Sequence, residues 1–173
     1  AEKFDHFVLD APKGYGIGGD RNFYFSHMLN CIYDCRYCFL QGLYRSAHYV
    51  LFVNYEDFQT AIEEKIKEAQ GEDAYFFSGY DCDSLALESL THFAAEFLPF
   101  FARYPNAWLE LRTKSVQIKT LLEMDPIPNC VVAFSLSPEN IVKALEDKTP
   151  SLERRLQAME QLGKAGWKLG LRF

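Results

Sequence analysis

The stretch Cys31-Ile32-Tyr33-Asp34-Cys35-Arg36-Tyr37-Cys38 contains three of the five cysteines of the chain. Their spacing is C-x3-C-x2-C, and they follow a short apolar, aromatic run at residues 22–29. Three thiols this close in sequence can all face one metal centre, whereas pairing them as disulfides always leaves one thiol over. The stretch therefore predicts a metal-binding loop at the end of a strand.

Thiolates are the usual ligands of iron–sulfur clusters, and the spacing of the cysteines reflects the type of cluster. In a [4Fe–4S] cube, three cysteines bind three irons and leave the fourth iron open to a small chelating molecule. We therefore interpret Cys31, Cys35 and Cys38 as ligands of a [4Fe–4S] cluster. Zinc is the alternative, but it normally requires a fourth protein ligand, for which His27 and His48 are the candidates.

Length and composition limit the classes of protein to consider. The 173 residues suit a single domain, and a hydrophobic content of 49% allows a sizeable core. A net charge of −6 argues against broad attraction to nucleic acid or to an anionic membrane, although it allows a local basic groove. We find no membrane span and no signal peptide in the sequence. We therefore expect a cytoplasmic protein, in which clustered cysteines are metal ligands or catalytic thiols.

Outward from the loop, apolar runs alternate with amphipathic patterns. We expect main strands at 22–29, 74–78, 107–113, 130–135 and 168–173, and a strand or extended connection at 49–53. Helices are expected at about 55–70, from Asp83 or Ser84 to about 101, from about 115, after Pro138, and from Thr149-Pro150 onward. This alternation predicts βαβ units and a parallel sheet.

The repeats favour an α/β fold of the partial (β/α) TIM-barrel type. No GxGxxG motif follows a strand, which argues against a Rossmann sheet. We assign residues 22–173 to the barrel core and residues 1–21 to an N-terminal extension, whose glycine-rich stretch at 14–19 is typical of a flexible loop. Because the chain ends on a strand, we expect a barrel that is truncated after about five βα units and lacks its C-terminal unit.

In such barrels the reactive groups lie at the carboxyl ends of the strands. The expected strand ends carry the cysteine loop, the segment 78–82, Thr113-Lys114 and the segment 135–137. The sequence therefore predicts one site built from these four places. Cys130 begins a strand and is expected to be a core thiol.

The motif C-x3-C-x-aromatic-C after a first barrel strand resembles the radical S-adenosylmethionine enzymes. The chain is similar, more closely, to the spore photoproduct lyase family over residues 22–173. The similarity is carried by Cys31, Cys35, Tyr37, Cys38, Leu40 and Gln41, and by the segments 83–92, 113–114, 134–135 and 166–170.

This resemblance implies that the open iron chelates S-adenosylmethionine and that an electron from the reduced cluster cleaves the sulfonium, which releases a 5′-deoxyadenosyl radical. In the lyase the radical takes a hydrogen atom from a thymine dimer in DNA, the dimer splits, and a protein cysteine returns a hydrogen. The implied function is a lyase in DNA repair, with S-adenosylmethionine, damaged DNA and an electron donor such as flavodoxin or ferredoxin as partners. The alternatives are a radical enzyme acting on a non-DNA substrate and a zinc-stabilised binding module without catalysis.

The resemblance also implies roles for individual residues. Tyr37 would pack on the adenine of the cofactor, and Lys114 and Ser135 would contact its methionine or ribose part. Asp83 would support the loop after the second strand.

Two positions differ from the lyase pattern. Tyr80 stands where the lyase has its hydrogen-donating cysteine, and Phe39 stands where the family has a tyrosine that helps to relay the hydrogen. Cys82 lies two residues after Tyr80. We therefore expect Cys82 or Tyr80 to act as the catalytic hydrogen donor, or the substrate to differ.

Overall fold

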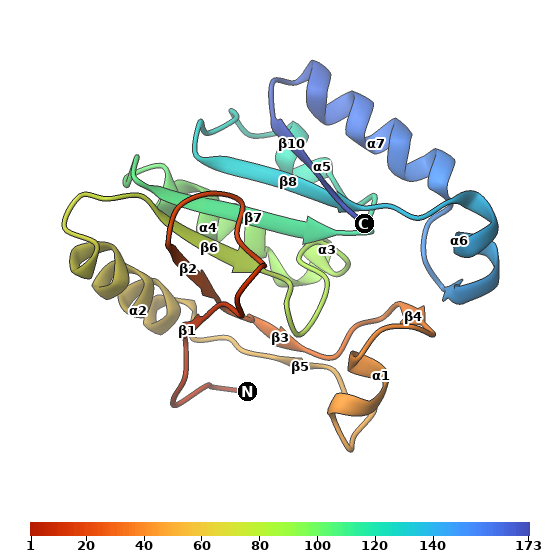
Figure 1. Ribbon diagram of the computed structural model, residues 1–173, viewed down its shortest axis with the longest axis horizontal. Coiled ribbons are helices and arrows are strands. Elements are labelled where there is room, and N and C mark those ends of the chain that lie inside the picture. The colour runs from red at the N-terminus through yellow and green to blue at the C-terminus, as the bar shows by residue number, and fades with distance from the viewer.

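Five parallel strands form the centre of the computed structural model, which describes residues 1–173 (Figure 1). The sheet has the order β1-β2-β6-β7-β8-β10, and only β1 runs antiparallel to its neighbour. Its strands are β1 (Leu9–Asp10), β2 (Arg21–Tyr24), β6 (Ala74–Ser78), β7 (Ala107–Thr113), β8 (Cys130–Ser135) and β10 (Lys168–Arg172). The predicted parallel sheet is confirmed.

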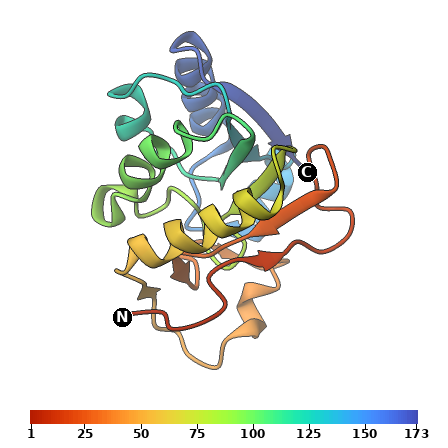
Figure 2. The same ribbon diagram turned by 90° about the vertical axis from the view of Figure 1, so that its left-hand side faces the viewer.

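The longer helices cover one face of this sheet, as Figure 2 shows. They are α2 (Tyr55–Glu68), α4 (Phe93–Phe101) and α7 (Leu152–Lys164), and the short α5 (Lys119–Leu122) lies between α4 and α7. Strand residues that face these helices, such as Phe76, Leu109 and Val132, are buried there in one apolar core. Cys130 is fully buried in the same core, as expected.

The opposite face of the sheet carries several polar and aromatic side chains. Tyr75, Trp108, Glu110 and Arg172 line a shallow cavity there. The N-terminal segment crosses this face, and its Gly18 and Gly19 lie directly against the Tyr75 ring. Helices on the outside of a parallel sheet, with the other face turned toward the interior, are the arrangement expected of a partial (β/α) barrel.

The run at 22–29 does not form one strand, contrary to the sequence-based expectation. β2 ends at Tyr24, and β3 (Met28–Leu29) pairs instead with β5 (Val50–Leu51) in a separate two-stranded sheet. The reason is the packing of His27, whose ring stacks on Phe93 of α4 at a centroid distance of 3.9 Å. This contact draws the chain out of the main sheet after Phe25.

The predicted helix from Asp83 or Ser84 to residue 101 is also divided. α3 (Glu88–Thr91) and α4 are separated by His92, whose φ of 51° lies in the left-handed region. The Glu88 carboxylate accepts a hydrogen bond of 2.9 Å from the Ala94 N–H, and so caps the start of α4 from the preceding turn. With this local bond, two short helices form in place of one continuous helix.

Helix starts were also predicted too early in two places. α7 begins at Leu152, with Ser151 rather than Thr149 as its N-cap, because the Ser151 hydroxyl accepts from the Arg154 N–H. α5 begins at Lys119 rather than near residue 115.

The remaining short elements surround the cysteine loop. They are α1 (Leu40–Leu43), α6 (Glu139–Leu145), and the two-stranded pair of β4 (Asp34–Cys35) with β9 (Glu146–Asp147). None of the helices is both long and apolar enough to cross a membrane.

Gly79, directly after β6, provides a test of this fold. Its φ is +77°, and an added Cβ would lie 2.5 Å from Ser84 Oγ and 2.9 Å from the Arg112 carbonyl oxygen. We expect Gly79→Ala to lower the free energy of unfolding by about 1–3 kcal/mol, measured by denaturant titration. Gly42 is the matched control, because it lies in α1 with open space around it, and Gly42→Ala should not destabilise the protein. Equal stability of the two variants would contradict this account of the turn.

Candidate functional site

The carboxyl ends of β6, β7 and β8 and the cysteine loop enclose a cavity of about 210 Å³. The structure brings most of the sequence-predicted site residues to its wall, namely Cys31, Cys35, Cys38, Tyr80, Cys82, Asp83, Lys114 and Ser135. Tyr37 lies in the neighbouring cavity of about 440 Å³, which Lys114 and Ser135 also line. The expected meeting of strand ends is therefore present in the fold.

The three loop cysteines are unpaired thiols in a largely buried setting. Cys35 is buried, Cys31 and Cys38 are partly buried, and all three pack around Tyr33 and Ala86. Burial, together with the nearby negative charge of Asp83, raises the pKa of Cys31 to about 12. Binding of a metal here would displace protons from the thiols.

The donor set suits a cluster better than a single ion. No group of three or more His, Cys, Asp or Glu side chains converges closely enough to hold one metal ion. A [4Fe–4S] cube spaces its thiolates more widely than a single ion does, because each thiolate binds a different iron. Cys31, Cys35 and Cys38 line one cavity, which neither His27 nor His48 lines, so the residues present fit three-cysteine cluster ligation.

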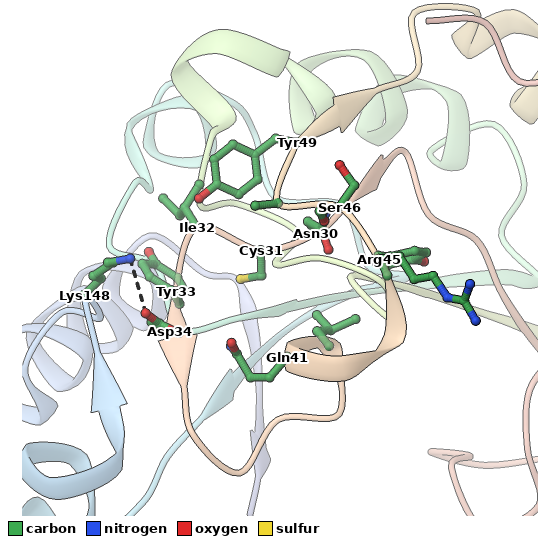
Figure 3. A pocket seen from close by; sticks show the side chains of 13 residues that line it. Asn30, Cys31, Ile32, Tyr33, Asp34, Gln41, Arg45, Ser46, Tyr49 and Lys148 are labelled. Atoms are coloured by element: carbon green, nitrogen blue, oxygen red, sulfur yellow. Dashed lines mark hydrogen bonds and ion pairs between the residues drawn. The ribbon is translucent and has the colours of Figure 1, made fainter.

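Cys31 also borders a second cavity, of about 460 Å³, on the other side of the loop (Figure 3). Gln41, Arg45 and Tyr49 line this cavity, and an ion pair of 3.3 Å between Lys148 Nζ and Asp34 Oδ2 lies at its margin. Cys31 therefore stands in the wall between the two cavities.

The Asp83 carboxylate links the loop after β6 to the end of β7. It accepts hydrogen bonds from the Thr113 hydroxyl (2.6 Å), the Lys114 N–H (2.6 Å) and the Leu85 N–H (3.0 Å). Burial raises the pKa of Asp83, and these three donors oppose that rise. The bonds hold the Lys114 backbone at the rim of the cavity.

Lys114 and Tyr37 lie close together at this rim. The Lys114 Nζ is 5.7 Å from the centroid of the Tyr37 ring, which is a cation–π distance. The Tyr37 side chain is largely exposed, while its hydroxyl donates a hydrogen bond to Glu146. An exposed aromatic face and an ammonium group are thus presented next to the cysteines.

Tyr80 and Cys82 have different surroundings. The Tyr80 ring lies among other aromatic rings, with centroid distances of 4.4 Å to Tyr24, 5.7 Å to Phe39 and 5.9 Å to Tyr15. Cys82 is buried, and burial raises its pKa well above the usual range. Its thiol therefore keeps its hydrogen at neutral pH.

Sequence reasoning missed two buried ion-pair groups near the site and one residue that lines the cavity. One is the buried Glu110, which pairs with Arg112 at 2.9 Å and with Arg172 at 2.5 Å. The other is Arg155, which pairs with Glu146. Arg155 continues the helical spacing of the apolar residues of α7, and a charge within such a stripe is the signal that could have revealed it. Tyr15, from the N-terminal extension, also lines the cavity, and its sequence context gave no signal.

Comparisons with known proteins point to one family. A family model described as "Spore photoproduct lyase" matches residues 23–173. The curated spore photoproduct lyase of Bacillus subtilis (strain 168) is 27% identical over 141 residues, and that of Geobacillus sp. (strain Y412MC61) is 28% identical over 141 residues. Each match covers 81% of this chain and 41% of the relative, so the chain spans less than half the length of these proteins.

Solved structures agree with this result. A mutant spore photoproduct lyase with bound AdoMet and dinucleoside spore photoproduct matches with a TM-score of 0.82 and 25% identity, over 86% of this chain and 44% of that one. Native anSMEcpe with bound AdoMet matches with a TM-score of 0.57 and 17% identity, over 82% and 40% of the two chains, and so shares the fold alone. The predicted α/β, partial-barrel fold is confirmed.

The environment of His27 generates a prediction for stability. Burial lowers the pKa of His27 to about 3, and its Nδ1 has no hydrogen-bond partner. Unfolded, the side chain titrates near its usual pKa of about 6.5. Because the unfolded state then binds more protons, stability should fall as the pH drops below about 6.5, until the folded side chain itself is protonated near pH 3.

The measurement is the free energy of unfolding as a function of pH. In His27→Phe, the free energy of unfolding should decrease less at acid pH than in wild type. The variant keeps an aromatic ring against Phe93 and has no group at this position to protonate. His48→Gln, at an exposed position, should leave the wild-type slope intact. Parallel pH profiles for wild type and His27→Phe would contradict the lowered pKa of His27 in the folded protein.

Proposed function

The chain belongs to the spore photoproduct lyase family, and on that basis we propose that it is a radical S-adenosylmethionine enzyme. Cys31, Cys35 and Cys38 would hold a [4Fe–4S] cluster. The observation that carries this proposal is that the three thiols line one cavity together with the ends of three parallel strands. Reactive groups gather at this end of (β/α) barrels.

When bound, the cluster would supply an open iron that chelates the amino and carboxylate groups of S-adenosylmethionine and an electron that cleaves its sulfonium. The residues of the chain would orient and shield the cofactor. The largely exposed ring of Tyr37 offers a face on which the adenine can stack. The Lys114 ammonium and the Ser135 hydroxyl lie on the same rim and can donate to the methionine or ribose oxygens. Asp83 keeps Lys114 in place through the backbone.

For the substrate, we propose a thymine-derived photoproduct in DNA, as in the relatives whose structures contain dinucleoside spore photoproduct. The lesion would have to leave the duplex to reach the strand ends. A small redox protein such as flavodoxin or ferredoxin would provide the electron. A cytoplasmic setting suits the five unpaired thiols, because that compartment keeps cysteines reduced.

The return of a hydrogen atom to the product radical is assigned to Cys82. Its buried thiol lines the cavity beside Cys31 and stays protonated, so an S–H bond is present to be broken. The hydrogen would pass to the product radical, and the thiyl radical left on Cys82 would be restored to the thiol by a hydrogen atom from 5′-deoxyadenosine, which would re-form the 5′-deoxyadenosyl radical. Tyr80 is the second candidate donor, because it lines the same cavity.

One observation favours a second function with the same cofactor chemistry. Tyr80 and Phe39 pack together, with ring centroids 5.7 Å apart, at the two positions where the resemblance to the lyase implies a cysteine and a tyrosine. A radical enzyme acting on a non-DNA substrate would not need the cysteine and the tyrosine that the lyase has at these two positions. An intact protein that forms 5′-deoxyadenosine but leaves photoproduct-containing DNA unchanged would support this function.

The cluster is tested by anaerobic reconstitution of the complete protein. We expect about four irons and four sulfides per chain, and formation of 5′-deoxyadenosine when dithionite and S-adenosylmethionine are added. Cys35→Ala should abolish both, whereas Cys130→Ala, which removes a core thiol remote from the loop, should preserve both. Bound zinc without iron or sulfide would instead identify a zinc-stabilised module, and a reconstituted cluster without cofactor cleavage would exclude radical chemistry.

The donor is tested by Cys82→Ala in the same preparation. If Cys82 returns the hydrogen, this variant should still cleave S-adenosylmethionine but should form repaired product at least about 100-fold more slowly, in line with the loss of a positioned hydrogen-transfer group. Tyr80→Phe is the matched variant and should retain turnover. Unchanged product formation in Cys82→Ala, with loss in Tyr80→Phe, would transfer the role to Tyr80.

A further inference from the structure

A buried ion pair joins the cysteine loop to the rest of the fold. Arg155 Nη2 donates to Glu146 Oε2 at 2.6 Å, and neither side chain is exposed to solvent. A buried pair is favourable only if its remaining hydrogen-bonding groups are also satisfied. Both partners meet this condition, and the groups that satisfy them are parts of the site.

On the arginine side, the guanidinium is fixed to the end of β8. Its Nη1 donates to the Ser135 carbonyl oxygen at 3.1 Å, and its Nε donates to the Pro150 carbonyl oxygen at 2.9 Å. Nη2 also lies 2.7 Å from Thr149 Oγ1. Ser135 lines the cavity, so Arg155 connects α7 to the strand end that borders the site.

On the glutamate side, the carboxylate is fixed to the cysteine loop. Glu146 lies in β9, directly opposite Cys35 of β4 in the antiparallel pair. Its Oε1 accepts a hydrogen bond of 3.0 Å from the Ser137 hydroxyl and another from the Tyr37 hydroxyl. Glu146 thus contacts the loop twice, at Cys35 through the pairing of β9 with β4 and at Tyr37 through its side chain.

The other links between these segments are weaker. The ion pairs Arg36–Asp147 (3.2 Å) and Lys148–Asp34 (3.3 Å) are both solvent-exposed. Exposed pairs of this kind contribute little to stability. The buried pair is therefore the main side-chain anchor of the Cys35–Cys38 half of the loop.

We propose that Glu146 and Arg155 are positioning residues for the iron–sulfur cluster. They would hold the segment with Cys35 and Cys38 beside the end of β8, so that these two thiols keep their positions as ligands of the cluster. The inference rests on the proposed function, since it concerns the cluster of that site. It assigns a role to two residues that would touch neither the cluster nor S-adenosylmethionine.

The test is the rate at which a strong iron chelator removes iron from the reconstituted protein. Glu146→Gln keeps the shape of the side chain but removes its charge and weakens its acceptors for Arg155 and Tyr37. Iron should be lost about tenfold faster than from wild type, as is typical when a residue behind the metal ligands is changed. The electron paramagnetic resonance signal of the reduced cluster should also shift, which a purely structural role would not produce.

Glu160→Gln is the matched control, because Glu160 forms an exposed pair with Lys164 at 2.6 Å on the same helix, α7. It should release iron at the wild-type rate. If Glu146→Gln fails to fold, Arg155→Lys is measured in its place. A lysine keeps the positive charge but cannot donate to all the acceptors that the guanidinium reaches. This variant should therefore also lose iron faster than wild type.

The outcomes separate this inference from the proposed function. Wild-type protein that binds no iron would overturn the proposed function. Wild-type protein that binds the cluster, together with a folded Glu146→Gln variant of unchanged release rate and unchanged spectrum, would overturn the positioning role alone.

Discussion

The parallel register of β6, β7 and β8 is the constraint on which the site depends. Ser78 of β6 lies opposite Leu111, and Thr113 of β7 lies opposite Phe134. Because parallel strands end on the same side of a sheet, the loops that follow them meet there. The Asp83 carboxylate then fixes two of these ends together through bonds to Thr113 and Lys114. Without that register, the strand ends would not enclose a cavity together with the cysteine loop.

Two groups of buried charges lie close to the site. Glu110 pairs with Arg112 and Arg172 on the inner face, and Glu146 pairs with Arg155 behind the cysteine loop. The helix-covered face, in contrast, is filled by apolar side chains. Each buried charge carries a desolvation cost that is offset only by close partners, so these pairs fix geometry near the site rather than add to stability.

The main strands and the cysteine triplet could be predicted because their signals are local. An apolar run such as 107–113 and a C-x3-C-x2-C spacing are visible without knowledge of distant residues. The errors arose where specific side-chain contacts, one distant and one local, overrode the preference read from the pattern. Stacking of His27 on Phe93 ended the first strand early, and the Glu88 cap on Ala94 divided a predicted helix.

The sequence by itself determined the three candidate cluster ligands, the order of strands and helices, and the polar residues that follow each strand. Only the tertiary structure decided which of these meet, because meeting depends on strand register and on contacts between residues far apart in the chain. Arg155 became part of the site through its bond to the Ser135 carbonyl oxygen, and Tyr15 through its place beside Tyr80. The cysteine loop was visible in the sequence from the start, whereas the buried Glu146–Arg155 pair that anchors it required the fold to bring β4, β9 and α7 together.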